Sequence, residues 1–244
     1  MPHFYAVIIG TEILNGRRQD KHFAFVKEAL EKRGMTLYAS LIVKDDAALI
    51  RRTFDYVKAD PQAVMFSFGG IGSTPDDLTR ELAAEVFTGE PLQRHPQFAH
   101  DIVERFGDEA YPHRIRMAEL PQGAQLLKNP VNNMSGFHLQ ARYFFMPGFP
   151  DMAHPMVEEA LTRFFPQNAD TYRRTLLAQT SENTLIDVMQ TVAPELEFSS
   201  LPMLKNGRPS VEISVAGKTR SEVDAAFTRF TEFLQREGIG YLET

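Results

Sequence analysis

The feature that most restricts what this chain can fold into is the alternation, near its start, of short apolar runs with segments of helical periodicity. The apolar runs cover residues 4–9, 36–43 and 63–68. Continuous apolar runs of this length are typical of strands buried on both faces of a sheet. After each run, apolar side chains recur every three or four residues, as along one face of a helix. Strands that alternate with helices pair in parallel through right-handed crossovers, so the sequence predicts an α/β fold with a mostly parallel sheet.

The second half of the chain has a different arrangement. A helix is expected near residues 98–106 and another over residues 150–165. Between them, candidate strands lie at residues 124–129, 136–140 and 143–147. The pattern restarts near residues 166–172 and then runs strand, helix, strand, strand, helix, strand, which is typical of a small split βαβ unit. We therefore expect a larger α/β domain, residues 1–168, followed by a small α+β domain, residues 169–244.

The composition excludes several classes of protein. The formal net charge of −6 is opposite in sign to that of proteins that coat nucleic acid. The chain has no cysteine, which removes disulfides and thiolate metal sites. Its N-terminus lacks the basic region and cleavage site of a signal peptide, and no apolar run approaches membrane-spanning length. We expect a cytoplasmic protein that binds neither nucleic acid nor membranes.

A glycine-rich segment follows the third apolar run. Residues 66–79 read FSFGGIGSTPDDLT, which places Gly69, Gly70 and Gly72 between a strand and a helix. Backbone N–H groups in such a loop can converge on an anion at the carboxyl end of a sheet. The segment is not a P-loop, because no Gly-Lys-Ser/Thr sequence follows.

The same segment also has a purely structural interpretation. With Thr74 as N-cap, Pro75 as the first helical residue and Asp77 as a capping-box-like partner, the helix would begin without any ligand. The glycine pattern alone leaves both interpretations open.

Two pairs of carboxylates follow two of the predicted strands. Asp45 and Asp46 come after the second strand, and Asp76 and Asp77 come after the third. In a parallel sheet both pairs lie at the same edge, where oxygen ligands could hold Mg²⁺ beside a phosphate. Either pair could instead serve the first turn of a helix, which acidic residues favour. Their joint position beside three glycines favours a site, with Asp45, Asp46 and Asp77 as metal ligands.

Two further segments follow strands and could line the same site. GTEILNG contributes Gly10, Thr11 and Glu12, and MPGFPDM contributes Pro147 and Gly148. Proline and glycine together fix turns, so a structural role is the alternative. The seven histidines show no clear metal-ligand spacing.

Five motifs, in this order, carry a resemblance to a known family: GTEILNG, VKDD, GGIGSTPDDLT, LPQGAQLLKNPVNNMSGF and MPGFPDM. Together they resemble the molybdopterin-binding (Mog/MoaB-like) domain, in the form found at the N-terminus of CinA proteins, across residues 4–165. The resemblance implies a three-layer α/β/α sandwich. Residues 171–244 resemble more loosely the small KH-like domain that follows in CinA proteins, and their C-terminal deamidase domain has no counterpart.

The resemblance also implies a ligand and a chemistry. In the Mog branch the glycine loop binds the pterin phosphate, and two aspartates that align with Asp45 and Asp77 are associated with Mg²⁺ and adenylyl transfer. In CinA-like proteins the same site is linked to metal-dependent hydrolysis of ADP-ribose. Asp45 and Asp77 are therefore the expected catalytic residues. The expected ligand-binding positions are Gly10, Thr11, Glu12, Gly69, Gly70, Ile71, Gly72, Ser73, Thr74, Asp76, Pro147 and Gly148.

The sequence departs from the family pattern at the glycine loop. The Mog branch has Thr at the position of Ile71 and Arg at the position of Asp76, and CinA proteins usually have Pro at the position of Ser73. A loop without a neighbouring basic residue suits a highly anionic pterin poorly, whereas a second carboxylate could recruit a metal that bridges a diphosphate.

We therefore expect a divalent-metal-dependent nucleotide pyrophosphatase that acts on an ADP-ribose-like substrate. The alternatives are a molybdopterin-binding protein and a non-catalytic ligand-binding or scaffold protein. The small domain lacks the Gly-x-x-Gly loop of RNA-binding KH domains, which favours a role in packing or dimerisation. A homodimer is expected from the CinA-like small domain, and a trimer, as in Mog-like proteins, is the alternative.

Overall fold

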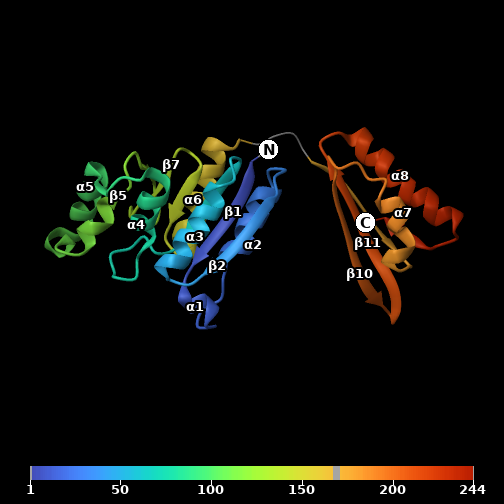
Figure 1. The fold of residues 1–244 in the computed structure, drawn as a ribbon, viewed down its shortest axis with the longest axis horizontal. Coiled ribbons are helices and arrows are strands. Elements are labelled where there is room, and N and C mark those ends of the chain that lie inside the picture. Colours follow the sequence, from blue (N-terminus) through green and yellow to red (C-terminus); the bar gives the residue numbers. More distant parts are fainter. Residues whose placement is uncertain (1, 167–170, 244) are drawn as a thin grey trace. The chain divides into compact units, whose positions relative to one another are not determined.

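The three apolar runs form neighbouring strands of one sheet in the computed structural model, which describes residues 2–166 and 171–243. The chain divides into two units, residues 1–167 and residues 168–244 (Figure 1). The predicted boundary, between residues 168 and 169, lies outside the described residues. Each unit has its own sheet and its own core, so each is described by itself.

The sheet of the first unit has six strands in the order β2-β1-β3-β8-β7-β6. The neighbouring pairs among β2, β1, β3 and β8 are parallel, whereas β7 is antiparallel to both β8 and β6. The strand bounds are β1 (His3–Ile9), β2 (Leu37–Val43), β3 (Ala63–Phe68), β6 (Gln125–Leu127), β7 (Gly136–Leu139) and β8 (Tyr143–Met146). The predicted α/β fold with a mostly parallel sheet is confirmed.

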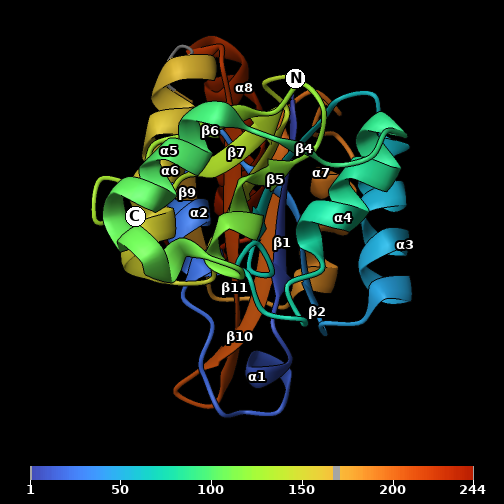
Figure 2. The ribbon, with the colours of Figure 1, turned by 90° about the vertical axis from the view of Figure 1, so that its left-hand side faces the viewer.

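Helices cover both faces of this sheet and give the molecule's first unit three layers. Figure 2 shows α3 and α4 on one side of β1, and α2 and α6 on the other. The bounds of the first pair are α3 (Ala47–Lys58) and α4 (Thr79–Ala83), and those of the second pair are α2 (His22–Glu31) and α6 (Pro150–Phe164). Helix α5 (Pro96–Phe106) packs on the same side as α3.

Several short elements complete the first unit and were not predicted. They are α1 (Thr11–Leu14), a π-helical turn over Ala84–Thr88, 3-10 turns at Gly107–Ala110 and Arg114–Ala118, and a ribbon of β4 (Gln93–Arg94) and β5 (Glu119–Leu120). Elements of two to five residues are too short to show a periodicity, so the sequence pattern does not reveal them.

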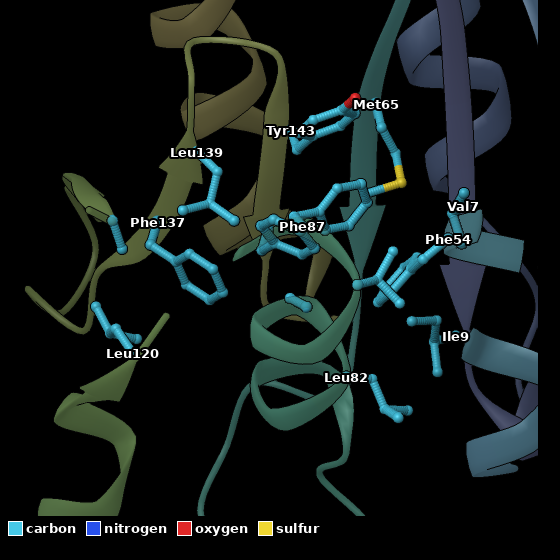
Figure 3. Packing of buried hydrophobic residues seen from close by; sticks show 14 of the residues in the cluster. Val7, Ile9, Phe54, Met65, Leu82, Phe87, Leu120, Phe137, Leu139 and Tyr143 are labelled. Carbon is cyan, nitrogen blue, oxygen red and sulfur yellow. The ribbon is translucent and has the colours of Figure 1, made fainter. Parts of the chain in front are cut away.

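Strand β3 is buried along its whole length, because apolar clusters lie on both of its faces. On one face Met65 belongs to the cluster in which the Phe87 ring stacks on the Tyr143 ring at 4.1 Å between centroids (Figure 3). On the other face Phe66 stacks on Phe144 at 5.3 Å. A strand that is buried on both faces has a continuous apolar sequence. Because β3 is held by packing on both faces, the start of the glycine loop that follows it is fixed.

The second unit is a four-stranded antiparallel sheet with the order β10-β11-β9-β12 and helices on one face. The bounds are β9 (Tyr172–Ala178), α7 (Ile186–Met189), β10 (Glu197–Lys205), β11 (Arg208–Gly217), α8 (Arg220–Arg236) and β12 (Tyr241–Glu243). The predicted order of elements is confirmed. Asn206 and Gly207 join β10 to β11 with φ angles of 53° and 74°, as a tight hairpin turn requires. The resemblance of this unit to KH domains stays a prediction.

The first helical segment of the second unit is short. A 3-10 turn over Glu182–Leu185 precedes α7, and the Ser181 side chain makes no capping hydrogen bond to a backbone amide. The Ser181 hydroxyl instead lies 3.2 Å from the Thr184 hydroxyl. Throughout the two described ranges, every helix is too short or too polar to cross a membrane.

Candidate functional site

The loops that follow β1, β2, β3 and β8 meet at the carboxyl ends of these strands. The Gly10 amide donates to the Val43 carbonyl oxygen at 3.0 Å, which joins the ends of β1 and β2. The Gly69 amide donates to the Met146 carbonyl oxygen at 2.9 Å, which joins the ends of β3 and β8. A Cβ atom placed on Gly148 would lie 3.5 Å from the Gly69 Cα atom. The structure therefore brings together the four loops on which the predicted site residues lie.

Gly69 allows the carboxyl ends of strands β1 and β3 to approach each other closely. Its φ angle is 100°, and a Cβ atom there would collide with the carbonyl oxygen of Ile9. A residue with a side chain satisfies neither condition. This glycine is therefore required by the fold of the loop, whether or not a ligand binds.

The carbonyl oxygens of the glycine loop are held by the two residues at the start of α4. Thr79 donates from its amide to the Gly70 oxygen at 3.0 Å and from its hydroxyl to the Gly69 oxygen at 2.9 Å. Arg80 donates from Nη2 to the Gly72 oxygen at 2.9 Å. Both residues are buried.

Three N–H groups of this loop are consequently open, which means that they have no hydrogen-bond partner among the described residues. In a trans peptide the carbonyl oxygen and the next N–H point in opposite directions, so holding three carbonyls turns three amides away from α4. These are the amides of Gly70, Ile71 and Ser73. In the part of the chain that the structure describes, no amide of residues 70–73 donates a hydrogen bond to another protein group. Consecutive open amides in a glycine-rich turn can bind an anion.

The helix after the loop begins later than predicted. Helix α4 starts at Thr79, whereas Thr74–Asp77 form a separate turn. In that turn the Asp77 Oδ2 atom accepts hydrogen bonds from the Thr74 amide at 2.8 Å and the Thr74 hydroxyl at 2.6 Å. The prediction that Thr74 caps the helix and Pro75 opens it is wrong, because the bond from the Thr79 amide to the Gly70 carbonyl closes the loop before the helix starts.

Arg80 is a candidate functional residue that the sequence patterns do not reveal. It is only 2% exposed, and its guanidinium donates to the backbone oxygens of Gly72, Arg116 and Glu119. The expectation that the loop lacks a neighbouring basic residue is therefore wrong. No sequence signal marks Arg80, because an arginine at the start of a helix normally lies at the surface.

Asp45 and Asp46 each hold a backbone amide. The Asp45 Oδ2 atom accepts from the Thr11 amide at 2.7 Å, and the Asp45 amide donates to the Thr11 hydroxyl at 3.2 Å. Asp46 is the N-cap of α3, and its Oδ1 atom accepts from the Leu49 amide at 2.8 Å. Asp45 thus ties the loop after β2 to the loop after β1, while Asp46 begins a helix.

The predicted metal site is not preformed. Among residues 2–166 and 171–243, no three His, Asp or Glu side chains lie together as metal ligands. Asp45, Asp46 and Asp77 each use a carboxylate oxygen to hold a backbone amide, that of Thr11, Leu49 and Thr74 respectively. This donor set fits Mg²⁺ poorly, and the assignment of these three residues as metal ligands stays a prediction without structural support.

The other predicted residues differ in what they offer a ligand. The Glu12 carboxylate lies over Gly10, where an added Cβ atom would be 2.8 Å from Oε2. Asp76 is exposed, and the nearby Thr74 hydroxyl holds the pKa of its carboxyl below the usual value. Ile71 is partly buried and packs against the hydrophobic core, so its amide is the polar group that it offers a ligand. Ser73, Pro147 and Gly148 are partly exposed at the same edge of the sheet.

A buried histidine lies behind the loop that follows β8. The His22 ring stacks on Phe68 at 4.2 Å between centroids, and its Nε2 atom is 3.4 Å from the Gly148 carbonyl oxygen. Burial lowers the pKa of His22 to about 4, so the ring is neutral near pH 7. Its Nδ1 atom has no hydrogen-bond partner among the described residues.

Comparison with known proteins places this arrangement in a wider context. Residues 5–167 match the family described as probable molybdopterin binding domain. A CinA-like protein from Nostoc punctiforme is 33% identical, over 65% of this chain and 39% of its own length. A putative competence-damage inducible protein from Moorella thermoacetica is 28% identical, over 96% of this chain and 59% of its own length. The chain thus spans 39% to 59% of the length of these two relatives.

A solved structure is similar to part of this chain. The protein CinA from Thermoplasma acidophilum superposes with a TM-score of 0.59 at 26% sequence identity. The similarity covers 66% of this chain and 96% of that chain.

Proposed function

Because this chain belongs to the family of probable molybdopterin-binding domains, we propose that it binds the phosphate-bearing pterin molybdopterin through the glycine loop, residues 69–77. The observation that carries this proposal is the set of open amides of Gly70, Ile71 and Ser73, whose peptide carbonyl oxygens are held by Thr79 and Arg80. Phosphate oxygens are strong acceptors for such amides. The family match supports this function better than it supports nucleotide hydrolysis.

The residues around the loop fit a phosphate group. Ile71 packs its partly buried side chain against the core, and its amide remains without a protein partner at the loop among the described residues. The turn at Thr74–Asp77 keeps the Asp77 carboxylate against the loop's own backbone. The buried Arg80 places a positive charge next to the Gly72 carbonyl group.

Binding of molybdopterin to the purified chain tests the proposal. We expect saturable binding by equilibrium dialysis and a raised melting temperature, since a ligand of the folded state alone stabilises it. The Gly70→Ala variant should bind weakly, because Gly70 has a φ angle of 67° and an added Cβ would collide with Thr79. Gly89→Ala is the matched control, as Gly89 also has a positive φ angle but no atom within 4 Å of the added Cβ. Absence of binding by the wild-type chain would overturn the proposal.

Hydrolysis of a nucleotide diphosphate is a second candidate. It is supported by Asp76, an exposed carboxylate three residues after Ser73 in the glycine loop, where it could act on a bound diphosphate or its water. In this reaction a water oxygen bonds to one phosphorus of ADP-ribose and the bridging P–O bond breaks, which releases AMP and ribose 5-phosphate. Incubation with ADP-ribose, FAD or NAD⁺, in EDTA and with Mg²⁺, Mn²⁺ or Co²⁺, tests it. AMP in none of these mixtures would eliminate this candidate.

We further propose that the second unit contributes to a homodimer. The edge strand β10 exposes Leu201 and Leu204, which are 57% and 77% accessible. Exposed apolar edge strands invite pairing with another chain. Light scattering of the full chain during gel filtration should give a dimer, and Leu204→Glu should shift it toward a monomer. A wild-type monomer at all concentrations would contradict this role.

A further inference from the structure

Arg80 is a buried cation whose hydrogen-bond partners are backbone carbonyl oxygens. Its guanidinium lies between the glycine loop and the segment that ends at β5, where it holds Gly72 on one side and Arg116 and Glu119 on the other. Within residues 2–166 and 171–243 it forms no ion pair, and its Nε atom has no hydrogen-bond partner. Burying a charge without an ion pair makes the free energy of folding less favourable. We therefore expect a residue such as Arg80 to have a function that offsets this cost.

The charged groups near Arg80 act on it only at longer range. Burial lowers the pKa of its guanidinium, and the carboxylates of Asp77, Glu81 and Glu119 partly oppose this effect, whereas Arg116 adds to it. An arginine stays protonated under these conditions. The loop of open amides therefore has a permanent positive charge directly behind it.

We propose that Arg80 is a positioning residue for the anionic ligand, which fixes the direction of the Gly72–Ser73 peptide and supplies the positive potential that draws the anion to the loop. This inference rests on the proposed function, because it assigns the source of the affinity of that same site. The bond from Nη2 to the Gly72 oxygen turns the Ser73 amide to the opposite side of the peptide plane. The guanidinium itself is bonded to the protein, so its charge acts on the ligand without contact.

Two substitutions separate Arg80 from a purely structural role. Arg80→Gln removes the charge and keeps a hydrogen-bond donor, and Arg80→Lys keeps a charge that can be titrated. The matched controls are Arg142→Gln and Arg142→Lys, because Arg142 also holds two backbone oxygens, those of Ala63 at 3.0 Å and Asp60 at 3.3 Å. Those oxygens lie at the amino end of β3, away from the glycine loop.

Binding of inorganic pyrophosphate by the full chain is measured by calorimetry from pH 6 to pH 9, together with the melting temperature of each variant. We expect Arg80→Gln to weaken binding by about tenfold, the order of the attraction between two unit charges several ångströms apart near a protein surface. We expect Arg80→Lys to bind well at pH 6 and progressively less toward pH 9, because burial lowers the pKa of a lysine and the neutral amine attracts no anion. The wild-type chain should not lose affinity for pyrophosphate between pH 6 and pH 9. The two Arg142 variants should bind pyrophosphate as the wild type does.

The outcomes distinguish this inference from the function on which it rests. If the wild-type chain binds neither pyrophosphate nor molybdopterin, both are overturned. If the wild type binds and folded Arg80→Gln binds within twofold of it, the inference alone is overturned. If Arg80→Gln does not fold, Arg80→Lys decides, and an affinity equal to that of the wild type at every pH overturns the inference.

Discussion

Thr11 and Asp45 exchange two hydrogen bonds at the carboxyl ends of β1 and β2. The Thr11 amide donates to the Asp45 carboxylate at 2.7 Å, and the Asp45 amide donates to the Thr11 hydroxyl at 3.2 Å. Each residue thus uses its side chain to satisfy the backbone of the other. The loops after β1 and β2 are thereby fixed relative to each other at the carboxyl edge of the sheet. The glycine loop after β3 lies at the same edge.

This relationship predicts that Asp45 contributes mainly to stability. Asp45→Ala leaves the Thr11 amide unpaired in a half-buried position, and we expect it to lower the free energy of unfolding by about 1–3 kcal/mol. Urea denaturation measures the change. Asp46→Ala is the control, for which loss of one N-cap should cost about 1 kcal/mol. Unchanged stability of Asp45→Ala together with lost ligand binding would instead assign Asp45 to the ligand.

Asp77 is predicted to shape the loop through hydrogen bonding rather than through charge. Asp77→Asn keeps an oxygen that can accept from the Thr74 amide and hydroxyl, and it removes one negative charge near the anion. We expect it to bind pyrophosphate as tightly as the wild type or more tightly, whereas Asp77→Ala should bind several-fold more weakly. Calorimetric titration compares the three. Normal binding by Asp77→Asn combined with lost AMP release would point to a catalytic carboxylate.

Gly69 is predicted to be the least replaceable glycine of the loop. Gly69→Ala combines a φ angle of 100° with a collision against the Ile9 backbone, and we expect a loss of about 3 kcal/mol or more. Gly89→Ala has a positive φ angle of 72° and open space, so we expect a loss of about 1 kcal/mol. Thermal unfolding ranks the two variants. Equal melting temperatures would show that the contact between β1 and β3 at Gly69 tolerates a side chain.

His22 is predicted to make stability fall in acid. Burial lowers its pKa from 6.5 to about 4, so between these values the unfolded chain binds a proton that the folded chain does not. The stability contributed by the neutral ring is complete above pH 6.5 and is lost as the pH falls toward 4, up to about 3 kcal/mol. Burial also lowers the pKa of His138 and His154, which adds to the same trend.

The His22→Phe variant isolates this contribution. Phenylalanine can keep the stack on Phe68 and does not titrate. Urea unfolding at pH 7.5 and pH 5 should show a smaller loss of stability for the variant than for the wild type. Identical losses in both proteins would assign the acid sensitivity to other groups.

The sequence by itself determined the alternation of strands and helices, the mostly parallel pairing and the positions of the loops after β1, β2 and β3. Strand β3 is recognisable because a strand buried on both faces must be apolar at every position, and the predicted span of residues 63–68 matches Ala63–Phe68. Parallel pairing then requires the loops after β1, β2 and β3 to share one edge of the sheet. The grouping of the candidate site residues follows from these local patterns.

Only the tertiary structure decided what each polar group at that edge does. Asp77 looked like part of a helix start, yet its carboxylate holds a separate turn, because Thr79 closes the loop before α4 begins. Arg80 gave no signal in the sequence, because its burial depends on carbonyl groups up to 39 residues away along the chain. Hydrogen-bond partners and the burial of a charge are properties of packing between distant segments. The periodicity of a sequence indicates which face of a helix or strand is apolar. It does not indicate which distant segment will supply a hydrogen-bond partner.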